Sequence, residues 1–261
     1  MSQFLTSVTA PSGAKANNDT RLLKLLAGIT MLVDHCGKML FPQYREMRLI
    51  GRLAFPLFAY CIALGAAYTK NPMRYLSRVV LLALISQPLY ALGLGHENTA
   101  MYSVPLMPNP LLSAWNLYVQ SWEKPSILLA LSLALGILLA LRSRQFILAL
   151  GLYLLCERFA GSLDYGINGV RFILICYLLL EHPLLYLPAV TAFWLWWSLQ
   201  GSGYSFFGFS FGMRIYGLPA VLLTAVPLRR SGQLPKWLSY GFYPAHLLFL
   251  TLVLHPFWIA A

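Results

Sequence analysis

Long apolar runs separated by short polar connections make up most of the chain from residue 21 onward. An α-helix rises about 1.5 Å per residue, so about 20 apolar residues cross a bilayer, and slightly fewer suffice inside a bundle. This rule predicts an all-α, polytopic membrane helix bundle of nine transmembrane helices, within a range of eight to ten. The predicted spans are 21–41, 48–69, 75–94, 126–141, 145–159, 167–181, 183–199, 213–228 and 238–259.

Two segments outside these spans have patterns of their own. Residues 1–20 are polar and predict a disordered cytoplasmic tail, which leaves 21–261 as a single transmembrane domain. The connection 95–125 is the longest, and we expect it to be an extracytoplasmic loop. Its amphipathic stretch 111–122 is typical of a short helix that lies on a membrane surface.

Composition supports a membrane protein. Hydrophobic residues form 59% of the chain and charged residues 10%, with a mean hydropathy of +0.65. A soluble domain carries about 25% charged residues, so a water-soluble globule and a disordered chain are both excluded. The four cysteines all fall inside apolar spans, without paired or metal-type spacing, and are interpreted as core residues.

The net charge of +11 would suggest nucleic-acid binding in a soluble protein. Here the basic residues lie in short clusters between apolar runs, as they do when they set orientation in a bilayer. With a cytoplasmic N-terminus, eleven of the 19 lysines and arginines fall on the cytoplasmic side and eight outside. We therefore expect the N-terminus inside, membrane lipids as the surroundings and no nucleic-acid partner.

The first two spans contain ionisable groups that a purely structural helix would avoid. Asp34 and His35 are adjacent within the first span, and charged groups at that depth usually face a cavity and mark function. Lys24 precedes His35 by eleven residues, which places both on one helix face, about 16 Å apart in height. Lys24 also fits a simple membrane anchor. Arg52 enters the second span from the side of Asp34, where it could pair with Asp34, hold an anionic ligand or snorkel to headgroups.

Other polar groups give weaker signals. The fifth-to-sixth connection carries Asp164, Tyr165 and Arg171, which could line a vestibule or form a solvated turn. The last span contains Tyr243 and His246, and a lone histidine there is often a buried residue bonded to a carbonyl. Gln87 fits an interhelical hydrogen bond. Phosphate-binding loops, nucleophile elbows and zinc-type motifs are absent from the sequence, so we expect no metal.

Several strings together resemble the TraX family, the multi-pass inner-membrane acetylases of conjugative pilin. The strings are Leu25 to Gly37, Ile50 to Tyr60, Tyr68 to Pro72, Asp164 to Gly166 with Gly169, and Phe242 to Leu247. The chain is also distantly similar to the membrane acyltransferase superfamily, in which a basic residue and a histidine recur at the Lys24-to-His35 spacing.

The resemblance implies transfer of an acetyl group from acetyl-CoA to the N-terminal amine of a pilin subunit in the bacterial inner membrane. His35 would then be the general base or the acyl carrier, with Arg52 stabilising the oxyanion. Asp34 or Asp164 would fix the tautomer of His35 or stabilise its imidazolium. Lys24, Asp164, Tyr165, Arg171, Tyr243 and His246 would bind substrate or cofactor. A pilin chaperone, a transporter and an acyltransferase with another acceptor remain alternatives, and the oligomeric state is open.

Overall fold

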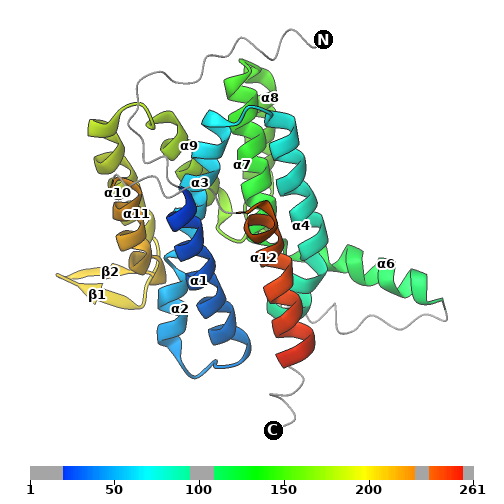
Figure 1. Ribbon diagram of the computed structural model, residues 1–261. Helices are drawn as coiled ribbons and strands as arrows, with labels where there is room; N and C mark the ends of the chain where they lie inside the picture. The colour runs from blue at the N-terminus through cyan, green and yellow to red at the C-terminus, as the bar shows by residue number, and fades with distance from the viewer. Residues whose placement is uncertain (1–19, 95–108, 227–234, 255–261) are drawn as a thin grey trace.

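The computed structural model describes residues 20–94, 109–226 and 235–254, which form a bundle of α-helices with one small β-hairpin. In Figure 1 most helices run side by side, while α6 projects from the bundle. The elements are α1 (Thr20–Met39), α2 (Arg45–Gly51), α3 (Ala54–Tyr68), α4 (Pro72–Leu94), α6 (Pro110–Gln120), η1 (Ser121–Glu123), α7 (Ile127–Arg142), α8 (Phe146–Arg158), α9 (Gly166–Leu178), α10 (Pro183–Leu199), β1 (Tyr204–Phe206), β2 (Phe209–Phe211), η2 (Met213–Gly217), α11 (Leu218–Thr224), α12 (Lys236–Leu248) and η3 (Phe249–Leu254).

The all-α bundle is confirmed, and a helix or a pair of helices lies at each of the nine predicted spans. Among the described residues, Arg45–Tyr68 and Pro72–Leu94 are long and apolar enough to cross a membrane, and a third candidate is the bent pair of α6 with α7. The number of spans therefore stays a prediction. Residues 1–19, 95–108, 227–228 and 255–259 of the predicted tail, loop and last two spans lie outside the described residues.

The α2–α3 segment lies at the centre of the bundle. Its most apolar window is 67% buried, compared with 33% for α4, and α3 packs against α1, α7, α9 and α11. The outer helices instead expose large apolar side chains, such as Ile147 on α8 and Leu184 on α10, at 90% and 89%. Apolar side chains on the outer surface of helices are expected where the surroundings are lipid. The arrangement is that of a membrane protein.

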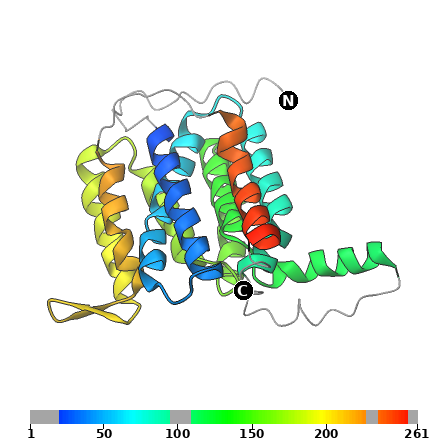
Figure 2. The ribbon, with the colours of Figure 1, turned by 60° about the horizontal axis from the view of Figure 1, so that its bottom comes forward.

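Gln87 of α4 fixes the bend between α6 and α7. Its Nε2 donates to the carbonyls of Ser121 and Lys124, and its Oε1 accepts from the backbone N–H of Ser126 at 2.9 Å. The two helices on either side of this bend differ in direction by 68°. The predicted interhelical hydrogen bond of Gln87 is thus confirmed, and the predicted helix within 111–122 is present as α6, which Figure 2 shows extending sideways from one end of the bundle.

The segment 204–211 folds into the antiparallel hairpin β1–β2, with Tyr204 opposite Phe211. Phe207 and Gly208 form its turn with φ of 50° and 81°, a conformation that two-residue hairpin turns require. Phe207 is fully exposed. The hairpin lies at the same end of the bundle as α6 (Figure 2).

Candidate functional site

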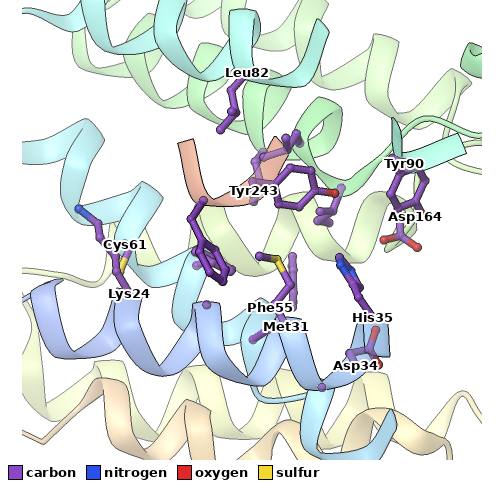
Figure 3. A pocket seen from close by; sticks show the side chains of 18 of the residues that line it. Lys24, Met31, Asp34, His35, Phe55, Cys61, Leu82, Tyr90, Asp164 and Tyr243 are labelled. Carbon is purple, nitrogen blue, oxygen red and sulfur yellow. The ribbon is translucent and has the colours of Figure 1, made fainter. Parts of the chain in front are cut away.

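A cavity of ≈ 310 Å³ extends beside α1 through the interior of the bundle. Lys24 lines one end of it, and His35 lies toward the other, as the common helix face of these two residues predicts. Figure 3 shows Lys24 at one side of the pocket and His35, Asp34 and Asp164 at the opposite side. Between the two ends, the lining is largely apolar and includes Met31, Phe55 and Leu82.

Asp34 is held by two arginines. Its Oδ1 lies 3.1 Å from Arg48 Nε and 3.1 Å from Arg52 Nη2. The close approach of α2 to α1 requires Gly51, because a Cβ at this position would overlap the Asp34 side chain. Of the alternatives for Arg52, pairing with Asp34 is therefore the one observed. Two guanidinium groups share one carboxylate, so this end of the cavity carries excess positive charge, to which Lys38 adds.

The side chain of His35 is hydrogen-bonded to that of another histidine. Its Nδ1 lies 2.8 Å from Nε2 of His246 on α12, and His246 Nδ1 lies 2.8 Å from the carbonyl oxygen of Phe242. Both imidazoles are buried, with the Tyr243 ring edge-on to each. Asp34 and Asp164, expected to fix the tautomer of His35 or to stabilise its imidazolium, therefore do not bond to its Nδ1.

His246, predicted as a substrate-binding or cofactor-binding residue, lies next to the cavity and not in its lining. His246 lies behind His35 and does not line the cavity among the described residues, whereas Tyr243 does. The sequence interpretation of a buried histidine bonded to a backbone carbonyl is correct for His246 Nδ1. What the sequence did not show is its second contact, with a residue 211 positions away.

The loop before α9 brings Asp164 and Tyr165 to the cavity. Gly166, at φ 58°, lets the chain turn into α9, and the Tyr165 ring stacks on Phe55 with 4.1 Å between centroids. Within the described chain, Asp164 has no ion-pair partner. Protein atoms surround its carboxyl and raise its pKa, an effect that Arg52 and Lys38 oppose. Much of its surface is nevertheless accessible, because it lines the cavity.

Arg171 does not belong to this site. Its guanidinium binds Glu157 and donates to Tyr153 Oη at 2.9 Å and to Asn168 Oδ1 at 3.1 Å. These contacts join α9 to α8, and Arg171 is not among the cavity-lining residues that the structure describes. The structure therefore places Arg171, predicted as a ligand-binding residue, in a contact between two helices.

A second hollow of ≈ 530 Å³ opens where α1 begins and shares Lys24, Cys61, Tyr75 and Tyr240 with the cavity. We call it the basic vestibule. Four cations line it, and no acidic side chain does among the described residues; the cations are Lys24, Lys70, Arg74 and Arg78. The last three follow one another at intervals of four, which places Arg74 and Arg78 on one face of α4. That spacing was a signal for a site, but clustered basic residues at a span end fit orientation equally well.

The part of the chain that the structure describes offers no group of three or more His, Cys, Asp or Glu side chains that could hold a metal ion. All four cysteines are free thiols, and three of them are buried. The ionisable groups that line the cavity are imidazole, carboxyl, guanidinium, ammonium, phenol and thiol groups.

A family model described as "TraX protein" matches residues 19–254. The chain belongs to the TraX family. The matched range contains all residues that line the cavity and the basic vestibule.

Two relatives of this TraX family member match shorter segments. The "Probable fimbrial assembly protein FimC, serogroup H1" of Dichelobacter nodosus is 32% identical over 73 residues, 26% of this chain and 30% of the relative. The "Uncharacterized protein RP591" of Rickettsia prowazekii (strain Madrid E) is 39% identical over 66 residues, 25% of each chain. The matches thus span less than a third of these relatives. No solved structure is similar to the chain.

Proposed function

We propose that this TraX family member is a membrane-embedded N-acetyltransferase that transfers acetyl from acetyl-CoA to the N-terminal amine of a conjugative pilin. The observation that carries the proposal is that the basic vestibule shares four lining residues, Lys24 among them, with a cavity that reaches His35. The similarity to a protein named as a probable fimbrial assembly protein supports a role in pilus maturation.

The basic vestibule suits the phosphates of the donor. Acetyl-CoA carries its phosphates at the nucleotide end and its thioester at the end of a long flexible arm. Lysine and arginine side chains are the usual partners of phosphate oxygens. With the nucleotide in the vestibule and the arm alongside α1, the thioester would pass Lys24 and lie toward His35, in a largely apolar passage that suits the arm.

The other end of the cavity suits acyl transfer to an amine. An α-amine has a pKa near 8, so a neutral imidazole can accept its proton during attack. The amine nitrogen would bond to the thioester carbon, the carbon–sulfur bond would break, and His35 would take the proton and pass it to the departing thiolate. Positive charge from Arg48 and Arg52, only partly balanced by Asp34, would stabilise the oxyanion. Transient acetylation of His35 is the alternative route.

The proposed orientation has a cytoplasmic N-terminus and nine spans in the inner membrane. It is supported by the helix or helix pair at each predicted span and by the basic vestibule, which would then open toward the cytoplasmic pool of acetyl-CoA. The site end, with α6 and the β-hairpin, would lie near the extracytoplasmic surface, where a processed pilin N-terminus emerges.

The proposal is tested with sealed membrane vesicles that contain this protein and candidate pilin. Radiolabelled acetyl-CoA is expected to label pilin in inverted vesicles, whose cytoplasmic face is outside, and not in intact right-side-out vesicles. Mass spectrometry should find one added acetyl group at the pilin N-terminus. A change in pilin amount without a change in mass would instead indicate a chaperone, and labelling of a glycan or lipid would indicate another acceptor.

Replacement of Arg74 or Arg78 by glutamine is expected to raise the KM for acetyl-CoA about tenfold and to leave the KM for pilin unchanged, because one charge-assisted phosphate contact is lost. With a donor that lacks the 3′-phosphate, the increase in KM should be smaller for the variant of whichever arginine binds that phosphate. Arg144→Gln is the control, since Arg144 lies in the α7–α8 turn and outside the vestibule lining. An unchanged KM in both vestibule variants would show that the donor does not bind in this hollow.

A further inference from the structure

The hydrogen-bond chain from His35 through His246 to the Phe242 carbonyl has a fixed direction at one end. A carbonyl oxygen can only accept, so the 2.8 Å contact requires that His246 Nδ1 carry the proton and donate it. A neutral imidazole carries one proton, so His246 Nε2 has a free lone pair.

The donor and acceptor roles of His246 also determine which nitrogen of His35 carries a proton. His246 Nε2 accepts across the 2.8 Å contact, so His35 Nδ1 must be the protonated nitrogen. The hydrogen bond made by one imidazole nitrogen sets the tautomer, and here it leaves Nε2 of His35 unprotonated. No hydrogen-bond partner for that Nε2 is present among the described residues.

The surroundings hold the two rings in this arrangement. The planes of the two imidazoles make an angle of 20° with centroids 5.0 Å apart, and the Phe242 ring stacks on His246. Tyr243 contacts both rings edge-on. The ionisable side chains that line the cavity at this end, from every element packed there, are Asp34, Lys38, Arg48, Arg52, Tyr90, Asp164, Tyr165 and Tyr243.

We propose that His246 is a positioning residue that keeps His35 in the Nδ1–H tautomer, so that Nε2 is the atom that accepts the proton of the acceptor amine. The inference rests on the proposed acyl transfer for its catalytic part and on the geometry alone for the tautomer. When Nε2 takes the proton, the positive charge on His35 is stabilised by the Nδ1–H donation to His246, whose own orientation is held by Phe242. Asp34, paired with Arg48 and Arg52, has no part in this chain.

The tautomer is tested directly by ¹⁵N NMR of the full-length protein with labelled histidine in detergent, near pH 8. The chain has five histidines, so the His35 signals are assigned from their loss in His35→Gln. We expect Nε2 of His35 to give the shift of an unprotonated nitrogen and Nδ1 that of a protonated one. Protonated Nε2 in the wild-type protein would overturn the inference, whatever the outcome of the acetylation assay.

Kinetics test the catalytic part. His246→Leu removes the acceptor for His35 Nδ1, and kcat is expected to fall about 100-fold while the KM for acetyl-CoA stays unchanged. His246→Gln offers a side-chain oxygen as an acceptor and should restore most of kcat and the Nδ1–H tautomer. His182→Leu, at the exposed α9–α10 turn, is the matched control and should alter neither measurement.

The two measurements separate the inference from the proposed function. Wild-type kcat in His246→Leu, with or without a changed tautomer, would overturn the role of His246 in proton acceptance. The expected tautomer in a wild-type protein that acetylates nothing would refute the proposed function and leave the positioning of His35 by His246 standing.

Discussion

His35→Ala is expected to lower kcat for pilin acetylation by about 10³-fold, the range typical for loss of a general base. The imidazole lines the cavity at the end that the thioester would reach, and its removal leaves the acceptor amine without a proton acceptor. The KM for acetyl-CoA should change little, because the basic vestibule lies about 16 Å away along α1 and remains intact. The rates are measured with purified protein in liposomes.

A matched control is available in His182→Ala, which removes an exposed histidine at the opposite end of α9 from Asp164. It should retain full activity. If His35→Ala acetylates pilin at the wild-type rate, the mechanism through His35 is wrong, both as base and as acyl carrier. Trapping of acetyl on His35 in a slow variant would favour the carrier route.

Asp34→Asn is expected to destabilise the fold by about 2–3 kcal/mol, since it leaves two half-buried arginines without their shared counter-ion. The three side chains are 17–30% exposed, so the expected cost lies below that of a fully buried pair. The variant should therefore show a lower midpoint of thermal unfolding in detergent, measured by the loss of helical circular dichroism.

Arg48→Met provides the comparison. It removes one of the two cations and leaves Asp34 paired with Arg52, so its loss of stability should be smaller than that of Asp34→Asn. The opposite order would show that the carboxylate is not the centre of this cluster. Because neighbouring charges interact, the double variant should be less unstable than the sum of the two single losses.

The sequence predicted most of the helices and the centre of the site, because both depend on local patterns. Apolar runs predict helices wherever they occur, and Asp34 and His35 are conspicuous because ionisable groups inside such runs are costly. Lys24 was found by its spacing from His35 along one helix. These features need only the 3.6-residue repeat of the α-helix.

The errors come from contacts between distant segments. The His35–His246 pair joins residues 211 positions apart, and no local pattern in one sequence shows which helices lie side by side. Arg171 was grouped with Asp164 and Tyr165 because all three lie in one connection. Its ion pair with Glu157 depends on the packing of α9 against α8, which is a tertiary feature. The four-residue spacing of Arg74 and Arg78 places both on one helix face, which could have indicated a binding site. Basic residues that only set the orientation in the membrane show the same pattern.

Positive charge at both ends of the cavity bears on the permeability of the membrane. A passage between the two faces of a membrane would dissipate the proton gradient if water and hydronium moved through it freely. Lys24 and its basic neighbours stand at one end and Lys38, Arg48 and Arg52 at the other, so a cation meets repulsion from either side. Fixed positive groups exclude protons from water-conducting pores in the same way, and here they would let an anionic donor enter while the energised membrane stays sealed.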